Sequence, residues 1–203
     1  MIRFVIFLAI AFSFGCHKSK ETTYYQNGAL HEEYSINKDG IKHGKYHILS
    51  EDGKTMEEGE YHEGHYKGTR TLFTNGLKEI EEFYDDNGNL NAPSFIYYPD
   101  GKIKIEKPYV NNKINGILKG YYPSGALKEE VTFSDNEENG PFTEYHPNGK
   151  VHWKGQYLNG DNEFGLLERF DTTGTLIKKM MCDSMAICRT FWKSDNYPAY
   201  EED

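Results

Sequence analysis

Four of the eight histidines lie close together in the N-terminal third and are the first candidates for metal chemistry. His43, His47, His62 and His65 could supply the imidazole nitrogens that zinc accepts. The position of His43, however, carries Lys, Asn or Phe in the equivalent segments further along the chain. Such variation is typical of a turn, so we predict no metal site here and no cofactor.

Two acidic segments resemble the start of a calcium-binding loop but lack its later ligands. Residues 135–140 begin with the right spacing, yet the twelfth position is His146, where a bidentate Glu is needed. Residues 85–89 lack the glycine required at the sixth position, which is Leu90. We therefore interpret both segments as solvated hairpin tips.

No set of residues has the spacing of a known catalytic group. The chain contains no Gly-x-Ser-x-Gly motif and no glycine-rich phosphate loop before a helix. Neighbouring carboxylates such as Glu129 and Glu130 point to opposite sides of a strand, so they cannot share a substrate. The sequence therefore predicts a protein that is not an enzyme, with no catalytic residues.

Aromatic residues recur at a fixed interval and are the strongest candidates for binding. Tyr97, Tyr121 and Tyr145 are 24 residues apart, which predicts that their rings stack in one column of a sheet. Two interpretations stay open. The rings form the core, or they form an exposed platform for an extended peptide or a glycan. A second column is expected from Tyr109, Phe133 and Tyr157.

Glycines at intervals of 23 to 25 residues define the elements that position these side chains. The series is Gly28, Gly53, Gly76, Gly101, Gly125, Gly149 and Gly174. Several of these glycines follow a proline by two residues, a pattern typical of tight turns. A second turn lies within each unit, where Asn112 and Asn136 replace glycine because Asn tolerates positive φ.

Between the turns, apolar and polar residues alternate with a period of two. Val151, Trp153 and Tyr157 share one side, whereas Lys150, His152 and other polar residues lie on the opposite side. This alternation is typical of antiparallel strands with one solvated face. We predict an all-β protein, an extended antiparallel meander of about six β-hairpin repeats of 24 residues in a single sheet.

The segments at residues 97–102, 121–126 and 145–150 resemble the bacterial MORN-type repeat variant. The resemblance extends over residues 25–179, which we assign to the repeat array. It implies a single extended sheet of hairpins. Bacterial members are often labelled as antitoxin components of toxin–antitoxin systems, and eukaryotic relatives are associated with membranes and protein scaffolding.

Residues 1–15 have the layout of a secretory leader, with Arg3 followed by an apolar run that is too short to span a bilayer. The sequence from Ser13 to Cys16 resembles a bacterial lipoprotein box, although the usual Leu is replaced by Ser13. We predict lipidation of Cys16, a linker over residues 16–24 and anchoring in the cell envelope. The alternative is an ordinary leader with a chance cysteine.

The C-terminal segment, residues 180–203, departs from the repeat and is expected to cap the array and end in an acidic tail. It contains Cys182 and Cys188. In an exported protein these two are expected to form a disulfide, the alternative being two free thiols.

The net charge of −9 and the lack of a Lys/Arg cluster exclude nucleic acid as a predicted partner. The favoured function is a lipid-anchored, non-enzymatic scaffold of the bacterial envelope that binds a protein of unknown identity. Two alternatives remain: an immunity or antitoxin-like protein that neutralises a cognate toxin, and a glycan-binding surface module.

Overall fold

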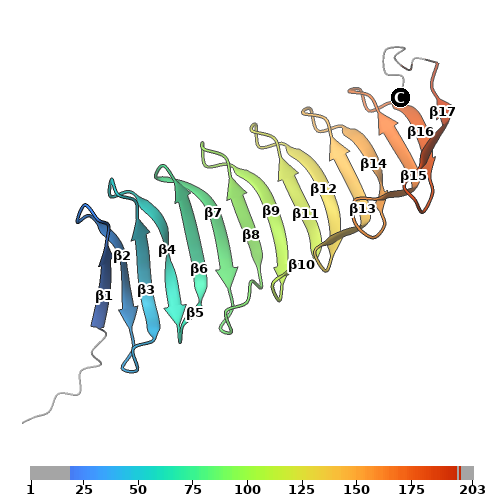
Figure 1. Cartoon of the computed structure of the whole chain (residues 1–203). Coiled ribbons are helices and arrows are strands. Elements are labelled where there is room, and N and C mark those ends of the chain that lie inside the picture. The colour runs from blue at the N-terminus through green and yellow to red at the C-terminus, as the bar shows by residue number, and fades with distance from the viewer. Residues whose placement is uncertain (1–18, 196, 198–203) are drawn as a thin grey trace, which may run out of the picture.

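The protein is one long, twisted, single-layered β-sheet that runs from its N-terminal to its C-terminal strand in chain order (Figure 1). The computed structural model describes residues 19–195 and residue 197. This part of the chain contains seventeen strands and no helix. Accordingly, the described residues include no helix that is long and apolar enough to cross a bilayer. The prediction of an all-β meander of hairpins is confirmed.

The strands are β1 (Ser19–Tyr24), β2 (Leu30–Ile36), β3 (Lys42–Leu49), β4 (Thr55–His62), β5 (His65–Tyr66), β6 (Gly68–Thr74), β7 (Leu77–Tyr84), β8 (Pro93–Tyr97), β9 (Ile103–Val110), β10 (Lys113–Ile114), β11 (Gly116–Tyr121), β12 (Leu127–Ser134), β13 (Glu137–Tyr145), β14 (Val151–Tyr157), β15 (Glu163–Phe170), β16 (Leu176–Cys182) and β17 (Cys188–Lys193). The short β5 and β10 precede β6 and β11 in the same positions of the sheet, because β4 pairs with both β5 and β6, and β9 with both β10 and β11.

Tight turns at the predicted glycines reverse the chain. At Gly101 the backbone φ is 83°, a conformation that residues with a side chain rarely adopt. The N–H of Gly101 donates to the carbonyl of Tyr98 at 2.9 Å, and the N–H of Tyr98 donates to the carbonyl of Lys102 at 2.8 Å. The periodic glycines therefore mark where one strand ends and the next begins.

The sheet extends beyond both predicted ends of the array. Ser19–Tyr24, which we expected in the linker, form β1 and pair with β2. Thr22, Thr23 and Tyr24 favour extended backbone, and β2 supplies a free edge for them to join. At the other end, Cys188–Lys193 of the predicted cap form β17, which pairs with β16. The leader (residues 1–15), Cys16 and most of the acidic tail lie outside the described residues.

Strand register separates two faces of the sheet. On one, Leu118 lies opposite Val131, and Val131 lies opposite Phe142. The row continues through Leu167 and Met180. We name this the core face, because Val131, Phe142 and Leu167 are buried in one cluster with Cys182. The second predicted column lies here too, with Phe133 and Tyr157 packed against the cluster.

The opposite side, which we name the polar face, bears a row of charged and hydroxyl side chains. Its members, one at each strand position from β9 to β16 because β10 and β11 share a position, are Glu106, Lys119, Glu130, Thr143, Lys154, Glu168 and Lys179. The Nζ of Lys154 lies 2.9 Å from a carboxylate oxygen of Glu168, and the Nζ of Lys179 lies 3.2 Å from the other oxygen. This row therefore consists of side chains that remain stable in contact with water.

The core face also contains a polar region. In its N-terminal part, the Tyr46 ring is buried and contacts the Tyr61 ring at a centroid distance of 4.5 Å. Further along the row, Arg70 lies opposite Glu82, and Ser94 lies opposite Lys107. An aromatic cluster and an apolar cluster thus lie on either side of a polar centre.

Candidate functional site

The three tyrosines predicted as a column lie on the polar face, opposite the buried hydrophobic cluster. Each hydroxyl donates a hydrogen bond to a carboxylate on an earlier strand, and the pairs are Tyr97 to Glu81 at 2.7 Å, Tyr121 to Glu106 at 3.3 Å and Tyr145 to Glu130 at 3.0 Å. Burial and the nearby carboxylate both raise the pKa of Tyr97. We name these six residues the tyrosine–glutamate ladder.

The rings of the ladder are not stacked on one another, which corrects the prediction. Tyr97, Tyr121 and Tyr145 lie on strands two positions apart in the sheet, a separation of about 9.6 Å. A glutamate from the intervening strand lies between successive rings, as Glu106 does between Tyr97 and Tyr121. The column is therefore a half-buried, hydrogen-bonded polar array rather than a continuous aromatic surface.

A small hollow of ≈ 280 Å³ lies beside the first ring of the ladder. Its lining combines the two aromatic rings of Tyr97 and Tyr98 with polar side chains that include Asn75 and Lys78. The Nζ of Lys78 lies 4.1 Å from the centroid of the Tyr97 ring, a cation–π contact. The hollow offers one apolar surface with hydrogen-bonding groups at its rim.

Two larger and shallower hollows lie where a glycine interrupts a strand. The first, of ≈ 720 Å³, surrounds Gly59 and is lined by charged and hydroxyl residues that include His47, Glu58 and Thr71. The second, of ≈ 470 Å³, surrounds Gly155 four repeats later. A side chain at Gly59 would meet the Tyr46 ring at 3.0 Å, so glycine is required for core packing at this position.

Acidic side chains gather at the C-terminal end of the core face, around Tyr157. Glu129 lies directly opposite Glu144, and Glu138 and Glu163 lie on the strands nearby. Burial raises the pKa of Glu163, and burial together with Glu129 raises that of Glu144. Burial and the four carboxylates raise the pKa of Tyr157 to about 12. This region has a concentrated negative charge.

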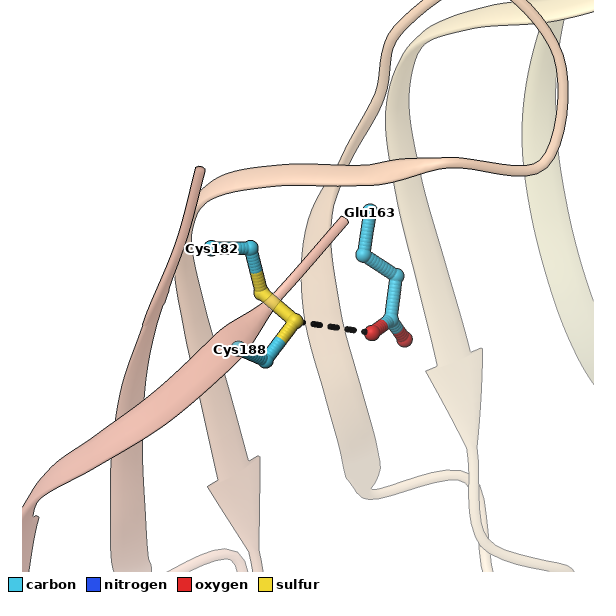
Figure 2. Close-up of side chains that lie close together, drawn as sticks. All are labelled: Glu163, Cys182 and Cys188. Carbon is cyan, nitrogen blue, oxygen red and sulfur yellow. Dashed lines mark hydrogen bonds between the residues drawn. A yellow bond between two sulfur atoms is a disulfide. The ribbon is translucent and has the colours of Figure 1, made fainter. Parts of the chain in front are cut away.

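The cysteine pair lies next to this acidic region (Figure 2). Cys182 and Cys188 face each other across β16 and β17 and are joined by a disulfide bond. The Sγ of Cys188 lies 3.3 Å from Oε2 of Glu163, which comes from the start of β15. In the described part of the chain, these three residues form the one group of three or more His, Cys, Asp or Glu side chains whose donor atoms lie within 4.8 Å of one another.

The four N-terminal histidines are distributed over β3, β4 and β5. The rings of His43 and His62 lie 4.9 Å apart, and Nδ1 of His43 lies 3.3 Å from Oε1 of Glu63. His47 lines the hollow around Gly59 instead. His65 lies directly opposite His62 in the β4–β5 pair. Three of the four therefore lie near one another, and His47 does not join them.

The two acidic segments form hairpin turns. Asp135 and Asn136 both have positive φ, at 54° and 74°, and Asp135 pairs with Lys113 at 3.0 Å. The carboxylate of Asp85 accepts hydrogen bonds from the N–H groups of Asn87 and Asn89. These carboxylates therefore stabilise turns.

Sequence reasoning missed several residues that join one repeat to the next. The side chains after the ladder tyrosines reach the backbone of the following repeat, and the bonds are Tyr98 to the Tyr121 carbonyl at 2.7 Å, Tyr122 to the Tyr145 carbonyl at 2.7 Å and His146 to the Phe170 carbonyl at 3.0 Å. The recurrence of Tyr or His directly before each proline was the signal that could have revealed them.

The ionic centre of the core face was also missed. The guanidinium of Arg70 contacts Glu57 and Glu82, each at 2.8 Å, and all three side chains are largely shielded from water. The pKa of Arg70 is raised, because its hydrogen bonds to Glu57 outweigh the effect of burial. No spacing rule in the sequence indicated that these residues meet.

The MORN repeat variant family model matches three segments of the chain, residues 91–111, 114–135 and 138–159. Each matched segment covers one strand–turn–strand unit of the sheet, and together they contain Tyr97, Tyr121 and Tyr145. No curated protein matches the chain.

Proposed function

We propose that this protein is a non-enzymatic protein-interaction scaffold, anchored to the membrane of a bacterial envelope by lipidation of Cys16. The observation that carries the proposal is the single-layered sheet, whose two faces are covered by no other element in the described part of the chain. Such an array offers a long contact surface. MORN repeats in general serve as modules for interaction with proteins and membranes.

The tyrosine–glutamate ladder is the proposed contact surface. Tyrosine combines a large apolar ring with a hydroxyl and loses little conformational freedom on binding, which suits a recognition surface. The ladder repeats with the period of the array, so one extended partner could contact Tyr97, Tyr121 and Tyr145 in turn. Its carboxylates favour a partner with basic groups at matching intervals.

Lipidation at Cys16 would also fix the orientation of the array. The sheet begins at Ser19, three residues later, and three extended residues span about 10 Å. The anchor would therefore hold β1 close to the bilayer and leave β17 at the distal end of the ribbon.

Site-specific photocrosslinking tests the scaffold. A crosslinker at Thr143, which lies two residues before Tyr145 on the polar face of the same strand, is expected to capture one protein reproducibly in cells. A crosslinker in the exposed turn at Glu51 is the control. Capture of a cognate toxin would identify the immunity-like alternative, and equal or absent capture from both positions would contradict the ladder as the contact surface.

Labelling with an alkyne fatty acid tests the anchor. The native chain is expected to incorporate the label, and Cys16→Ser is expected to lose it and to leave the membrane fraction. Equal labelling of the two chains would refute lipidation of Cys16.

Glycan binding is a second candidate, favoured by the hollow beside Tyr97. An aromatic surface with amide and ammonium groups at its rim is suited to a sugar ring. Retention of the chain on a polysaccharide column, lost in Tyr97→Ala and kept in Tyr145→Ala, would support it. Unchanged retention of Tyr97→Ala would exclude this hollow as the binding site.

A further inference from the structure

We propose that Glu163, Cys182 and Cys188 form a binding site for a thiophilic divalent cation such as Zn²⁺ when the disulfide is reduced. The three side chains come from three consecutive strands, β15, β16 and β17, and converge at one end of the sheet (Figure 2). Thiolate sulfur and carboxylate oxygen are both zinc ligands. This inference is independent of the proposed scaffold function.

The spacing of the donor atoms is close to that of a tetrahedral site. Zinc–sulfur and zinc–oxygen bonds of about 2.3 and 2.0 Å place a sulfur and an oxygen ligand about 3.5 Å apart, and two sulfurs about 3.8 Å apart. The Sγ of Cys188 and Oε2 of Glu163 already lie 3.3 Å apart. The Sγ of Cys182 lies within 4.8 Å of the Glu163 carboxylate. The two sulfurs must separate, and they lie on the last pair of residues before the β16–β17 turn.

The partly buried carboxylate of Glu163 has the Sγ of Cys188 as its one side-chain contact within hydrogen-bonding distance among the described residues. Among residues 19–195 and 197, no N–H donor or cation lies within bonding distance of it. Its neighbour is the Sγ of Cys188, which carries no hydrogen while the disulfide is intact. Half-buried carboxylates are normally hydrogen-bonded or paired. A cation bound between this oxygen and the two sulfurs would provide the missing partner.

The surrounding charge also favours a cation. Glu138 and Glu144 lie on β13, two positions from β15 in the sheet and on the same face as Tyr157, and Glu144 is close enough to Glu163 for mutual repulsion. A divalent cation at the cysteine pair would reduce this repulsion. The negative charge of this region would not attract a neutral ligand.

A phosphine reductant transfers two electrons to the S–S bond and is itself oxidised to the phosphine oxide with water, and the two sulfurs gain two protons. Binding of the cation releases these protons, each thiolate then donates a lone pair, and Glu163 supplies the third ligand and water the fourth. The oxidised chain retains only the carboxylate, so the disulfide and the bound ion exclude each other.

Cobalt(II) titration of the full-length chain carrying Cys16→Ser tests the proposal, because this substitution removes the third thiol. The phosphine-reduced protein is expected to bind one Co²⁺ with the charge-transfer absorption of cobalt–thiolate bonds and the visible bands of a tetrahedral ion. Zinc is expected to displace it. The oxidised protein is expected to show neither absorption.

Two glutamate variants test whether Glu163 is a ligand of the ion or whether the two thiols bind cobalt by themselves. Glu163→Gln is expected to weaken cobalt binding at least about tenfold, since loss of even an outer-shell partner has that effect. The matched control Glu137→Gln, at an exposed position of β13, is expected to bind as the parent does. Circular dichroism of each reduced chain, with and without zinc, reports whether the sheet persists.

Three results would overturn the proposal. They are the absence of cobalt–thiolate absorption in a reduced chain that keeps its sheet, equal affinity in Glu163→Gln and the parent, and loss of the sheet on reduction that zinc does not restore.

Discussion

The adjacent tyrosines that precede Pro99 and Pro123 have different roles, because their hydroxyls reach in opposite directions along the array. The Tyr97 hydroxyl donates to Glu81, on an earlier strand, whereas the Tyr98 hydroxyl donates to the backbone of Tyr121, one repeat later. The first tyrosine of each pair therefore builds the ladder, and the second joins repeats. A substitution of the first tyrosine should affect binding of a partner, and a substitution of the second should affect the stability of the array.

The hydrophobic cluster is small, so single residues within it matter. Leu167 is 1% exposed, and its neighbour Leu166, on the opposite face, is 43% exposed. Leu167→Ala is expected to lower the free energy of unfolding by about 2–5 kcal/mol, through lost apolar contact and the cavity left behind. Leu166→Ala is expected to change it by less than about 0.5 kcal/mol. Urea denaturation of both variants checks the difference, and equal losses would contradict the assignment of the two faces.

The acidic region near Tyr157 predicts a pH-dependent stability. Burial, followed by repulsion from Asp161 and Glu129, raises the pKa of Glu138 above its ordinary value of 4.5. A carboxyl with a raised pKa binds its proton more tightly in the folded chain. It therefore stabilises the fold below its unfolded pKa, and this contribution is lost as the pH rises through the folded pKa.

Glu138→Gln removes the ionisable group, so the variant does not lose stability through ionisation at this position as the pH rises. The variant is expected to be more stable than the parent at pH 7 by up to about 0.5 kcal/mol, with the difference shrinking as the pH falls to 4. Glu137→Gln, at the adjacent exposed position, is the control and should show no such trend. Thermal unfolding between pH 4 and 7 measures both, and a constant difference across this range would refute the prediction.

At the scale of elements, the turns do more than reverse the chain. Asn136 has a φ of 74°, which explains why Asn replaces Gly there. Its side-chain Oδ1 also accepts a hydrogen bond from the Ile114 N–H at 2.7 Å, and its own N–H donates to the Ile114 carbonyl at 3.0 Å. Each such turn thus holds the preceding repeat in place.

Substitutions at Asn136 can separate these two contributions. Asn136→Gly keeps the positive φ and loses only the side-chain bond, so a loss of about 1 kcal/mol is expected. Asn136→Ala loses the bond and adds the penalty of positive φ, about 1–2 kcal/mol more. Hydrogen exchange of the Ile114 amide should accelerate in both variants. Equal stability of the parent and Asn136→Gly would show that the side-chain bond contributes nothing.

Periodicity was sufficient to predict the turns and the alternation of the strands, because both depend on residues within one repeat. It could not predict β1, since Ser19–Tyr24 precede the first glycine turn and are fully exposed on both faces. It also could not place Tyr121 relative to its neighbours, because the register shifts between Gly120 and Tyr121. The approach of Glu163 to Cys188 depends on the pairing of three strands and has no local signal.

At the scale of the whole molecule, a polar centre lies between the two clusters of packed side chains on the core face. Ser94 is 4% exposed, and its hydroxyl has no hydrogen-bond partner in the described chain. Arg70 and its two glutamates lie between this serine and the tyrosine cluster around Tyr46. The Arg70 ion pairs therefore join the strands of this region together with backbone hydrogen bonds and a row of apolar side chains on the same face, in which Leu72 lies opposite Ile80 and Ile80 lies opposite Ile96.

Because the sheet is single-layered, we predict that the molecule is more extended than a compact fold of the same length. The seventeen strands occupy fifteen positions, because β5 and β10 share theirs with β6 and β11, and fourteen spacings of about 4.8 Å give a ribbon about 67 Å long. A ribbon of that length has a radius of gyration of about 20 Å or more, whereas a compact chain of 203 residues has one of about 17 Å. Small-angle X-ray scattering of the chain without residues 1–15, carrying Cys16→Ser, measures the difference. A value near that of the compact chain would mean that the ribbon folds back on itself, which would cover one face and leave the tyrosine–glutamate ladder or the core face unable to meet a partner.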